Sequence, residues 1–369
     1  MTTTSVSLSI GGAPREAKKQ FTRLNPLTGE EATLAAAASV ADAQAAVEAA
    51  AKALPAWSAL GPNARRALLS KAADAFDARS DDFVDAMMNE IGATEGWARF
   101  NLMLASSMLR EAAALTTQIN GEVIPSDKPG CISMAVREPA GVVLGIAPWN
   151  APIILGMRAI AVPLACGNTV VLKASEICPR THALIIEAMI EAGLGDGIVN
   201  MISNAPEDAG DVVGAMIDHP AVRRINFTGS TAVGRIIAKR AAENLKPVLL
   251  ELGGKAPMIV LADADIDEAV AAAAFGAFMN QGQICMSTER LIVEESIADE
   301  FMQKFSAKVA TMKVGDPREG KTPLGAVVDL KTVSHVESLV ADALSQGAVQ
   351  ANGGESKGVL MPATVIDKV

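Results

Sequence analysis

Two patterns of hydrophobic positions divide the chain. Across residues 39–115, alanine and larger apolar residues recur with a helical period, which predicts a group of helices. The first should begin after Ser39, because its hydroxyl and the Asp42 carboxylate can satisfy free amide groups there. Pro55 and then Gly61-Pro62 should cut this region into several helices, since proline removes a backbone donor.

Beyond residue 140, short apolar runs alternate with helical segments. Strands are expected at 141–147, 169–172, 198–202 and 224–227, with helices beginning near residues 152, 180, 206 and 230. A second block begins near Gly253, with strands at 258–261 and 291–293 and a helix capped by Asp265 with Glu268 three residues on. Because such strands need crossover connections, the predicted fold is α/β, with two doubly wound parallel-sheet domains.

Residues 121–139 lie between the two patterns. Pro125, Pro129 and Gly130 among short β-prone runs predict a hairpin here. Residues 361–369 are typical of a strand with nothing after it to close the unit, so we expect a C-terminally incomplete chain. The expected domains are 1–119 with 141–251, a hairpin at 120–140, and a truncated domain at 252–369.

Composition excludes several classes of protein. The 369 residues are 50% hydrophobic and 20% charged, enough to bury the cores of two domains. A net charge of -10 without a basic block argues against nucleic acid as a partner. Four cysteines without a C-x-x-C pair, and three histidines, favour neither a disulfide framework nor a metal site. No secretion signal or long charge-free apolar stretch is evident, so a cytoplasmic protein without membrane contact is expected.

Cys285 is a candidate nucleophile. It follows the apolar helical run 269–279 and precedes a strand, and a loop between rigid elements is a suitable place for a reactive group. The alternative is an inert, packed cysteine, and the other three cysteines, Cys131, Cys166 and Cys178, are assigned to it.

Glu251 is a candidate general base because it interrupts an apolar run, 247–254, that would be buried on both faces of a sheet. Burial would raise the pKa of this carboxyl toward neutrality, where a base works best. A buried ion pair is the alternative. Gly253 and Gly254 beside it would allow close backbone approach.

Asn150 stands where a strand meets the helix that Pro152 should open. Its side-chain amide could hold developing negative charge, or it could simply cap the helix. The run from Gly229 to Gly234 also joins a strand to a helix, a context in which amides meet phosphate, although it is neither G-x-G-x-x-G nor a Walker loop.

Three charged residues stand out in otherwise apolar surroundings. Lys173 and Glu176 follow a strand at the edge where open α/β sheets bind nucleotides, and they could hold ribose hydroxyls or be ordinary solvated charges. Arg158 is a lone cation on an apolar helix, so it either pairs with a buried carboxylate or faces a ligand. Trp97 is either core packing or an aromatic wall of a pocket.

Together, and in this order, these motifs resemble the NAD(P)-dependent aldehyde dehydrogenase superfamily over nearly the whole chain. The signatures are 148–150, 173–176, 227–230 with Gly234, 250–255 and 282–285. The stretches 158–176 and 284–290 are most similar to bacterial salicylaldehyde dehydrogenases, with vanillin and benzaldehyde dehydrogenases next. Two features differ from the family. Ala174 stands where many members have proline, and a later Glu-Glu-Ile-Phe-Gly-Pro segment is absent.

The resemblance implies oxidation of an aromatic aldehyde similar to salicylaldehyde to its acid with NAD, or alternatively NADP, in a homo-oligomer. The alternatives are a vanillin or broad-range aldehyde dehydrogenase, and a catalytically inactive homologue with a binding or structural role. It implies that Cys285 is the nucleophile, Glu251 the base and Asn150 the oxyanion donor. The implied substrate residues are Arg158, Trp97, Asn150, Ile284 and Met286. The implied cofactor residues are Ile146, Pro148, Trp149, Lys173, Ser175, Glu176, Gly210, Phe227, Gly229, Ser230, Val233, Leu252 and Gly253.

Overall fold

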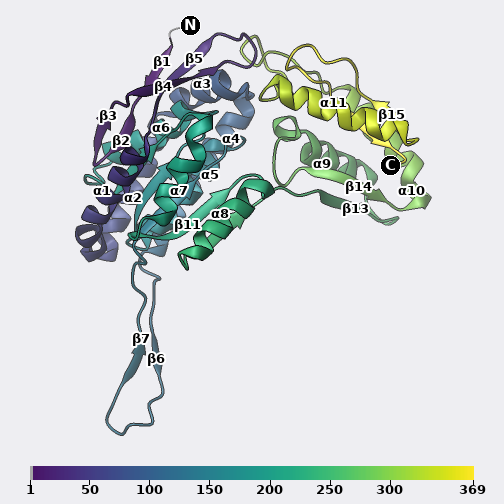
Figure 1. Ribbon diagram of the computed structural model, residues 1–369. Helices are drawn as coiled ribbons and strands as arrows, with labels where there is room; N and C mark the ends of the chain where they lie inside the picture. Colours follow the sequence, from purple (N-terminus) through teal and green to yellow (C-terminus); the bar gives the residue numbers. More distant parts are fainter. Residues whose placement is uncertain (1–2) are drawn as a thin grey trace.

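The computed structural model describes residues 3–369 and is built around a seven-stranded sheet (Figure 1). The strand order is β12-β11-β8-β9-β10-β2-β3, and the first five of these strands are parallel. The strands are β8 (Val142–Ile146), β9 (Thr169–Lys173), β10 (Val199–Ile202), β11 (Val222–Thr228), β12 (Val248–Glu251), β2 (Leu8–Ile10) and β3 (Ala13–Arg15). The α/β parallel-sheet prediction is confirmed.

The direction in which strands are added to this sheet reverses at β8. The chain first adds β9 and β10 on one side of β8, and it then returns to add β11 and β12 on the other side. A reversal of this kind leaves a crevice beyond the carboxyl ends of the two strands that flank it, here β8 and β11. The loops that follow these two strands, near residues 150 and 230, therefore lie beside the crevice.

Two helical layers cover the sheet, each with its own buried apolar cluster. On one side, α5 (Pro152–Ala165) and α6 (Pro179–Glu191) contact the sheet, and α2 (Pro62–Ala78), α3 (Ser80–Ile91) and α4 (Glu95–Leu115) pack against these two helices. The other layer consists of α1 (Val40–Ala59), α7 (Ala209–Asp218) and α8 (Thr231–Glu243), and a short 3₁₀ turn, η1 (Pro206–Asp208), precedes α7. Among the described residues, no helix is long and apolar enough to cross a bilayer.

The expected helix boundaries are only partly confirmed. Ser39 and Asp42 form the predicted reciprocal cap of α1, and α2 begins at Pro62. The predicted break at Pro55 is wrong, because α1 continues through it to Ala59. Tertiary anchoring accounts for this continuation: the buried Trp57 donates from Nε1 to the carbonyl of Leu164 at 3.1 Å.

The N-terminal strands are elements that the hydrophobic pattern did not indicate. The strands β1 (Thr4–Val6), β5 (Glu31–Ala37) and β4 (Lys19–Leu24) form a separate three-stranded sheet. The strands β2 and β3 add an antiparallel edge to the large sheet.

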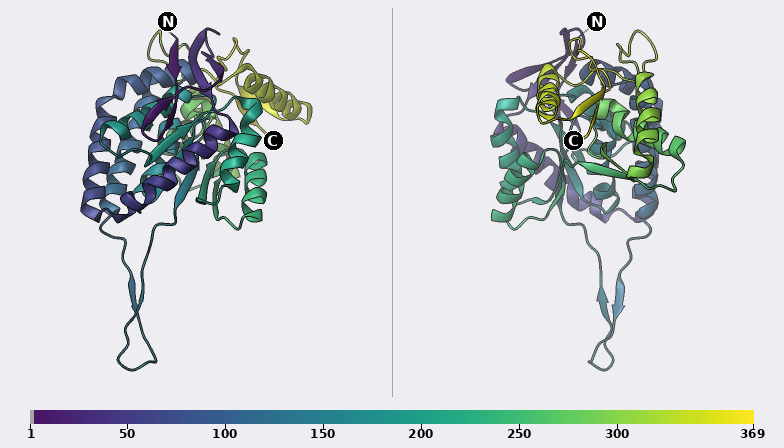
Figure 2. Two further views of the ribbon diagram at one scale, coloured as in Figure 1. Left: turned by 60° about the vertical axis from the view of Figure 1, so that its left-hand side comes forward. Right: turned by 90° about the vertical axis from the view of Figure 1, so that its right-hand side faces the viewer.

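The predicted hairpin is present and projects away from the body of the molecule (Figures 1 and 2). It pairs β6 (Glu122–Ile124) with β7 (Ser133–Ala135) in antiparallel register. Its apolar side chains are largely in solvent: Val123 is 76% exposed and Ile132 is 80% exposed.

The remaining residues form a second lobe with its own buried cluster. Asp265 caps its first helix by accepting from the amides of Asp267 and Glu268, as expected. The predicted last strand is present as β16, paired with β15. The elements are β13 (Ala256–Val260), α9 (Ile266–Phe278), η2 (Met279–Gly282), β14 (Thr288–Val293), α10 (Glu295–Ala310), α11 (Leu330–Ser345), β15 (Val349–Asn352) and β16 (Val365–Asp367).

Glu90 joins three elements of the first lobe. Its fully buried carboxylate accepts from the backbone amides of Arg180 and Thr181 at 2.7 and 2.9 Å, and from the hydroxyls of Thr181 and Thr33. Burial raises the pKa of Glu90, although the hydrogen bonds from Thr181, Arg180 and Thr33 oppose that rise. A carboxylate from α3 thus caps the N-terminus of α6, where the helix dipole favours negative charge.

Replacing Glu90 by Ala should lower the free energy of unfolding by about 3 kcal/mol, because it leaves buried donors without an acceptor. Glu90→Gln keeps one acceptor oxygen and should lose about half as much. Urea denaturation of both variants measures this. A loss below about 0.5 kcal/mol for Glu90→Ala would contradict the assigned role.

Candidate functional site

The structure brings the loop of Asn150 and the loop of Cys285 together. The Asn150 side-chain amide donates from Nδ2 to the carbonyl of Gln283 at 2.9 Å. Gln283 is two residues before Cys285, and Ile284 between them packs against the main core of the first lobe. The bond therefore joins residues that are 133 positions apart in the chain. The Cys285 thiol is free and exposed, so it is not packed in a core.

The backbone of Asn150 is held by two further side chains. Its carbonyl accepts from Nε1 of Trp97 at 3.0 Å and from Nδ2 of Asn280 at 3.0 Å. Trp97 is only 4% exposed and stacks on Phe100, so most of its ring belongs to the core. The two donors come from the first turn of α4, which precedes Asn150 in the chain, and from η2, which follows it.

A left-handed turn precedes Cys285. Asn280, Gln281 and Gly282 have φ of 49°, 56° and 73°. Left-handed backbone costs about 1–3 kcal/mol at a residue other than glycine, so neighbouring contacts must hold this turn. Side-chain amides supply them: Gln281 accepts from the amide of Gly325 and donates to the carbonyl of Ala326.

The side-chain amide of Gln283 forms a further bond between this loop and residues 325–328. Oε1 of Gln283 accepts from the backbone of Val328 at 2.9 Å. The carbonyl of Val328 in turn accepts from the guanidinium of Arg23, whose Nε donates to the carbonyl of Glu90. The loop that carries Cys285 is thereby tied to the helical layer of the first lobe.

The other three cysteines differ from one another. Cys178 is buried, and burial raises the pKa of its thiol well above the ordinary value. Burial also raises the pKa of Cys166. Cys131 is exposed on the hairpin, so its assignment as a packed cysteine is wrong. The reason is that the hairpin leaves the body of the protein, and no core surrounds it.

The prediction that Glu251 is buried is wrong. The residue is exposed, and β12 alternates between half-buried and exposed positions rather than being covered on both faces. The reason is topological, because β12 is the edge strand of the large sheet. A Cβ added at Gly253 or Gly254 would meet no atom within 4 Å, so the expected close approach of protein backbone is also absent among the described residues.

Arg158, on α5, lies on the face of the large sheet from which the Glu251 side chain emerges. Its Nη2 donates to Oγ1 of Thr228 at 3.5 Å. Thr228 is the register partner of Glu251 in the parallel pair of β11 with β12, so their side chains emerge on the same face. Within residues 3–369 no carboxylate forms an ion pair with Arg158, which removes the buried-pair alternative.

Lys173 and Glu176 are not ordinary solvated charges. The side chain of Lys173 is 8% exposed and lies 3.1 Å from Oε2 of Glu176. Although burial acts against it, the attraction of Lys173 and hydrogen bonds lower the pKa of Glu176. A paired Lys and carboxylate at the carboxyl end of β9, beside the crevice, suit the hydroxyls of a dinucleotide ribose.

The N-terminus of α8 meets the second requirement of a dinucleotide. Ser230 caps the helix by accepting from the amide of Val233 at 3.3 Å, and both residues are exposed. The first turn of this helix can therefore receive a phosphate group. A Cβ at Gly234 would lie 2.7 Å from a terminal methyl of Leu252, so a side chain there would require Leu252 to shift.

The other expected cofactor residues differ in their exposure. Pro148 and Trp149 follow β8 and are half-buried, and Gly210 is exposed in the first turn of α7. Ile146, Ser175 and Phe227 are buried, so any contact with a ligand from them would come mainly through their strands and loops. Of the expected substrate residues, Met286 is 77% exposed.

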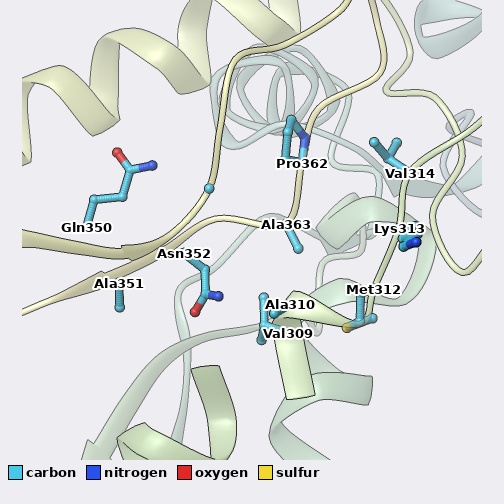
Figure 3. Close-up of a pocket in the computed structure, with 11 residues that line it drawn as sticks. Val309, Ala310, Met312, Lys313, Val314, Gln350, Ala351, Asn352, Pro362 and Ala363 are labelled. Atoms are coloured by element: carbon cyan, nitrogen blue, oxygen red, sulfur yellow. The ribbon is translucent and has the colours of Figure 1, made fainter. Parts of the chain in front are cut away.

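The second lobe has a cavity of about 700 Å³ at the end of α10 (Figure 3). Its lining includes none of the expected site residues. The polar group of Asn352, at its edge, is already bonded to the hydroxyl and carbonyl of Ser306. The cavity is therefore separate from the site formed around Asn150 and Cys285.

The residues that sequence reasoning missed are the amides that hold the site. Asn280, Gln281 and Gln283 stand in the sequence only as neighbours of Cys285. A signal for them exists: three side-chain amides around a glycine form an amide-rich run between an apolar helix and a strand. Their partners at 325–328 were not predictable, because the hydrogen bonds join segments about 45 residues apart.

A doubly wound sheet whose strand order reverses between β8 and β11, with the Asn150 loop bonded to the loop that carries Cys285, is the kind of fold that binds dinucleotides. The sequence profile of the aldehyde dehydrogenase family matches residues 13–369. The chain belongs to the aldehyde dehydrogenase family, which confirms the expected family and its nicotinamide cofactor.

Individual relatives agree with this assignment. A vanillin dehydrogenase from Pseudomonas fluorescens is 56% identical over 366 residues, which cover 99% of this chain and 76% of the relative. A salicylaldehyde dehydrogenase from Pseudomonas putida is 49% identical over 95% of this chain and 73% of the relative. The crystal structure of a salicylaldehyde dehydrogenase from Pseudomonas putida G7, complexed with salicylaldehyde, superposes with a TM-score of 0.97 at 47% identity, covering 99% of this chain and 76% of that one.

Asn280→Gly should lower kcat about tenfold with little loss of stability, because glycine keeps the left-handed backbone but removes the donor to Asn150. Asn280→Ala should also lose about 1 kcal/mol of stability through backbone strain. Steady-state kinetics and thermal melting separate the two effects. Unchanged kcat in Asn280→Gly would show that this bond does not position Asn150.

Proposed function

We propose that the protein oxidises ring-hydroxylated aromatic aldehydes to carboxylic acids with NAD. The observation that supports the proposal is the bond from Nδ2 of Asn150 to the carbonyl of Gln283, two residues before Cys285, whose thiol is exposed. The relatives named for vanillin and salicylaldehyde support an aromatic substrate.

Cys285 and Asn150 perform the first half of the proposed reaction. The thiolate of Cys285 attacks the aldehyde carbon, and a thiohemiacetal forms on the enzyme. The carbonyl oxygen becomes an oxyanion, which the Asn150 amide and the Cys285 backbone N–H stabilise. One donor of this kind is commonly worth about 3–4 kcal/mol of barrier.

Glu251 performs the second half. When bound, NAD would supply the hydride acceptor that converts the thiohemiacetal on Cys285 to a thioester. Glu251 removes a proton from water, which attacks the thioester and releases the acid. Because Glu251 is exposed at the edge of the sheet, water can reach its carboxylate. The proposed role as a base therefore does not require the burial that the sequence suggested.

The residues that would hold NAD are those beside the β8–β11 crevice. Lys173 and Glu176 would take ribose hydroxyls, and the first turn of α8 after Ser230 would take the pyrophosphate. Glu176 would disfavour the extra phosphate of NADP because both carry negative charge.

Arg158 is proposed to choose among aldehydes. Its guanidinium lies on the Glu251 side of the sheet edge without a carboxylate partner in the described chain, and it can donate to a ring hydroxyl. Trp97, Ile284 and Met286 remain proposed neighbours of the ring. Trp97 offers little of its surface, so its main effect would pass through Asn150.

The hairpin at 120–140 is proposed as a contact between subunits of a homo-oligomer. Its exposed apolar side chains, such as Val123, Ile132 and Met134, gain by burial against a second chain. We also propose that residues 252–369 form a domain apart from 1–119 with 141–251, supported by their separate sheets and buried clusters.

Cys285→Ala should reduce aldehyde-dependent NADH formation by more than about a thousandfold, because no nucleophile remains. NAD binding, measured by calorimetry, should stay within about twofold, since the thiol does not hold the cofactor. Cys166→Ala, at a half-buried cysteine outside the proposed site, is the matched control and should retain activity. Sustained turnover in Cys285→Ala would overturn the nucleophile assignment.

Glu251→Gln should lower steady-state kcat about 10²–10⁴-fold while a rapid first turnover of NADH persists. The reason is that only hydrolysis of the thioester needs the base. Stopped-flow absorbance measures the burst. A variant that loses the burst and the steady state equally would contradict the division of roles.

Arg158→Ala should lower kcat/KM for salicylaldehyde relative to benzaldehyde about tenfold, equivalent to about 1.4 kcal/mol. The two substrates differ only by the hydroxyl that Arg158 is proposed to recognise. Vanillin, with its hydroxyl elsewhere on the ring, serves as the third substrate. An unchanged ratio would exclude Arg158 from substrate choice.

A further inference from the structure

His182 occupies a position that the proposed reaction does not use. It lies in the first turn of α6 and is fully buried. Its Nδ1 accepts from the backbone amide of Ser175 at 3.1 Å, and its Nε2 lies 3.1 Å from the carbonyl of Pro152. One imidazole therefore touches two loops at the carboxyl end of the large sheet.

The partners define the state of the ring. A backbone amide can only donate and a carbonyl can only accept, so Nδ1 carries no proton and Nε2 carries one. Burial lowers the pKa of His182 to about 4, and the positive charge of Lys173 acts in the same direction. The imidazole is thus neutral across the range in which such an enzyme works.

The two loops have different tasks. Ser175 lies between Lys173 and Glu176, the pair proposed to hold a ribose. Pro152 opens α5 two residues after Asn150, the proposed oxyanion donor. The ring therefore sets the separation between the place where the cofactor is held and the place where the aldehyde reacts.

The surroundings leave this ring little freedom. The Glu90 carboxylate holds the amides of Arg180 and Thr181, the two residues before His182. On α5, a Cβ at Gly156 would lie 3.3 Å from the His182 ring, so the absence of a side chain there makes room for the imidazole. Hydrogen bonds and packing therefore hold both the helix and the ring.

We infer that His182 is a positioning residue that couples the cofactor loop at 173–176 to the oxyanion loop at 150–152. The inference rests on the proposed function of those two loops. Its hydrogen bonds keep Glu176 and Asn150 at a fixed separation, so NAD binding and the rate of the chemical step both depend on them.

Three variants of the intact protein test this inference. His182→Phe keeps the ring volume but removes both bonds, and His182→Gln keeps one donor and one acceptor. Met189→Ala, one of the buried residues of the same helix, damages packing without touching either loop and is the matched control. For each variant we would measure KM for NAD, kcat, thermal stability and hydrogen exchange of peptides covering 150–155 and 174–178.

His182→Phe should raise KM for NAD and lower kcat, each about tenfold, and speed exchange in both peptides. His182→Gln should recover most of this, and Met189→Ala should lose stability with both constants near wild type. The inference is overturned if His182→Phe matches Met189→Ala, or if glutamine rescues nothing. Hydrogen exchange distinguishes this failure from failure of the proposed function, because it reports the loops even if no aldehyde is oxidised.

Discussion

The reversal of strand order between β8 and β11 is the constraint on which the rest of the structure depends. Parallel strands bring all their carboxyl ends to one edge, and at the reversal the crossover helices diverge to opposite faces. Each proposed functional group follows the carboxyl end of one strand: Asn150 follows β8, Lys173 ends β9, Ser230 follows β11 and Glu251 ends β12. The second lobe only has to present one loop, with Cys285, to the same edge.

The loop that carries Cys285 is held by hydrogen bonds between side-chain amides and backbone groups. A left-handed turn at 280–282 is unfavourable by itself, and it persists because amide side chains of η2 and its neighbours bond to loops from both lobes. The same principle acts beneath the cofactor loop, where Glu90 and His182 bind backbone groups of α6 and its surroundings. Side chains that bond to backbone groups, rather than ion pairs at the surface, therefore set the geometry of the site.

Local chemistry was predictable from the sequence, and long-range geometry was not. The cap at Ser39, the start of α2 at Pro62 and the alternation of strands with helices depend on adjacent residues, and each is present. Pro55 was misjudged because the anchor of Trp57 lies in another helix. Glu251 was misjudged because an apolar run does not reveal that its strand lies at a sheet edge. The contacts of Gln281 and Gln283 with residues 325–328 were also unpredictable, because they join segments that are distant in the sequence.

A crystal structure of the protein with NAD bound would show where the cofactor lies. We predict that the pyrophosphate lies against the first turn of α8, a ribose lies between Lys173 and Glu176, and the nicotinamide lies near Asn150, Glu251 and Cys285. A dinucleotide bound away from the carboxyl ends of β8 and β11, or a nicotinamide remote from the Cys285 sulfur, would contradict this prediction.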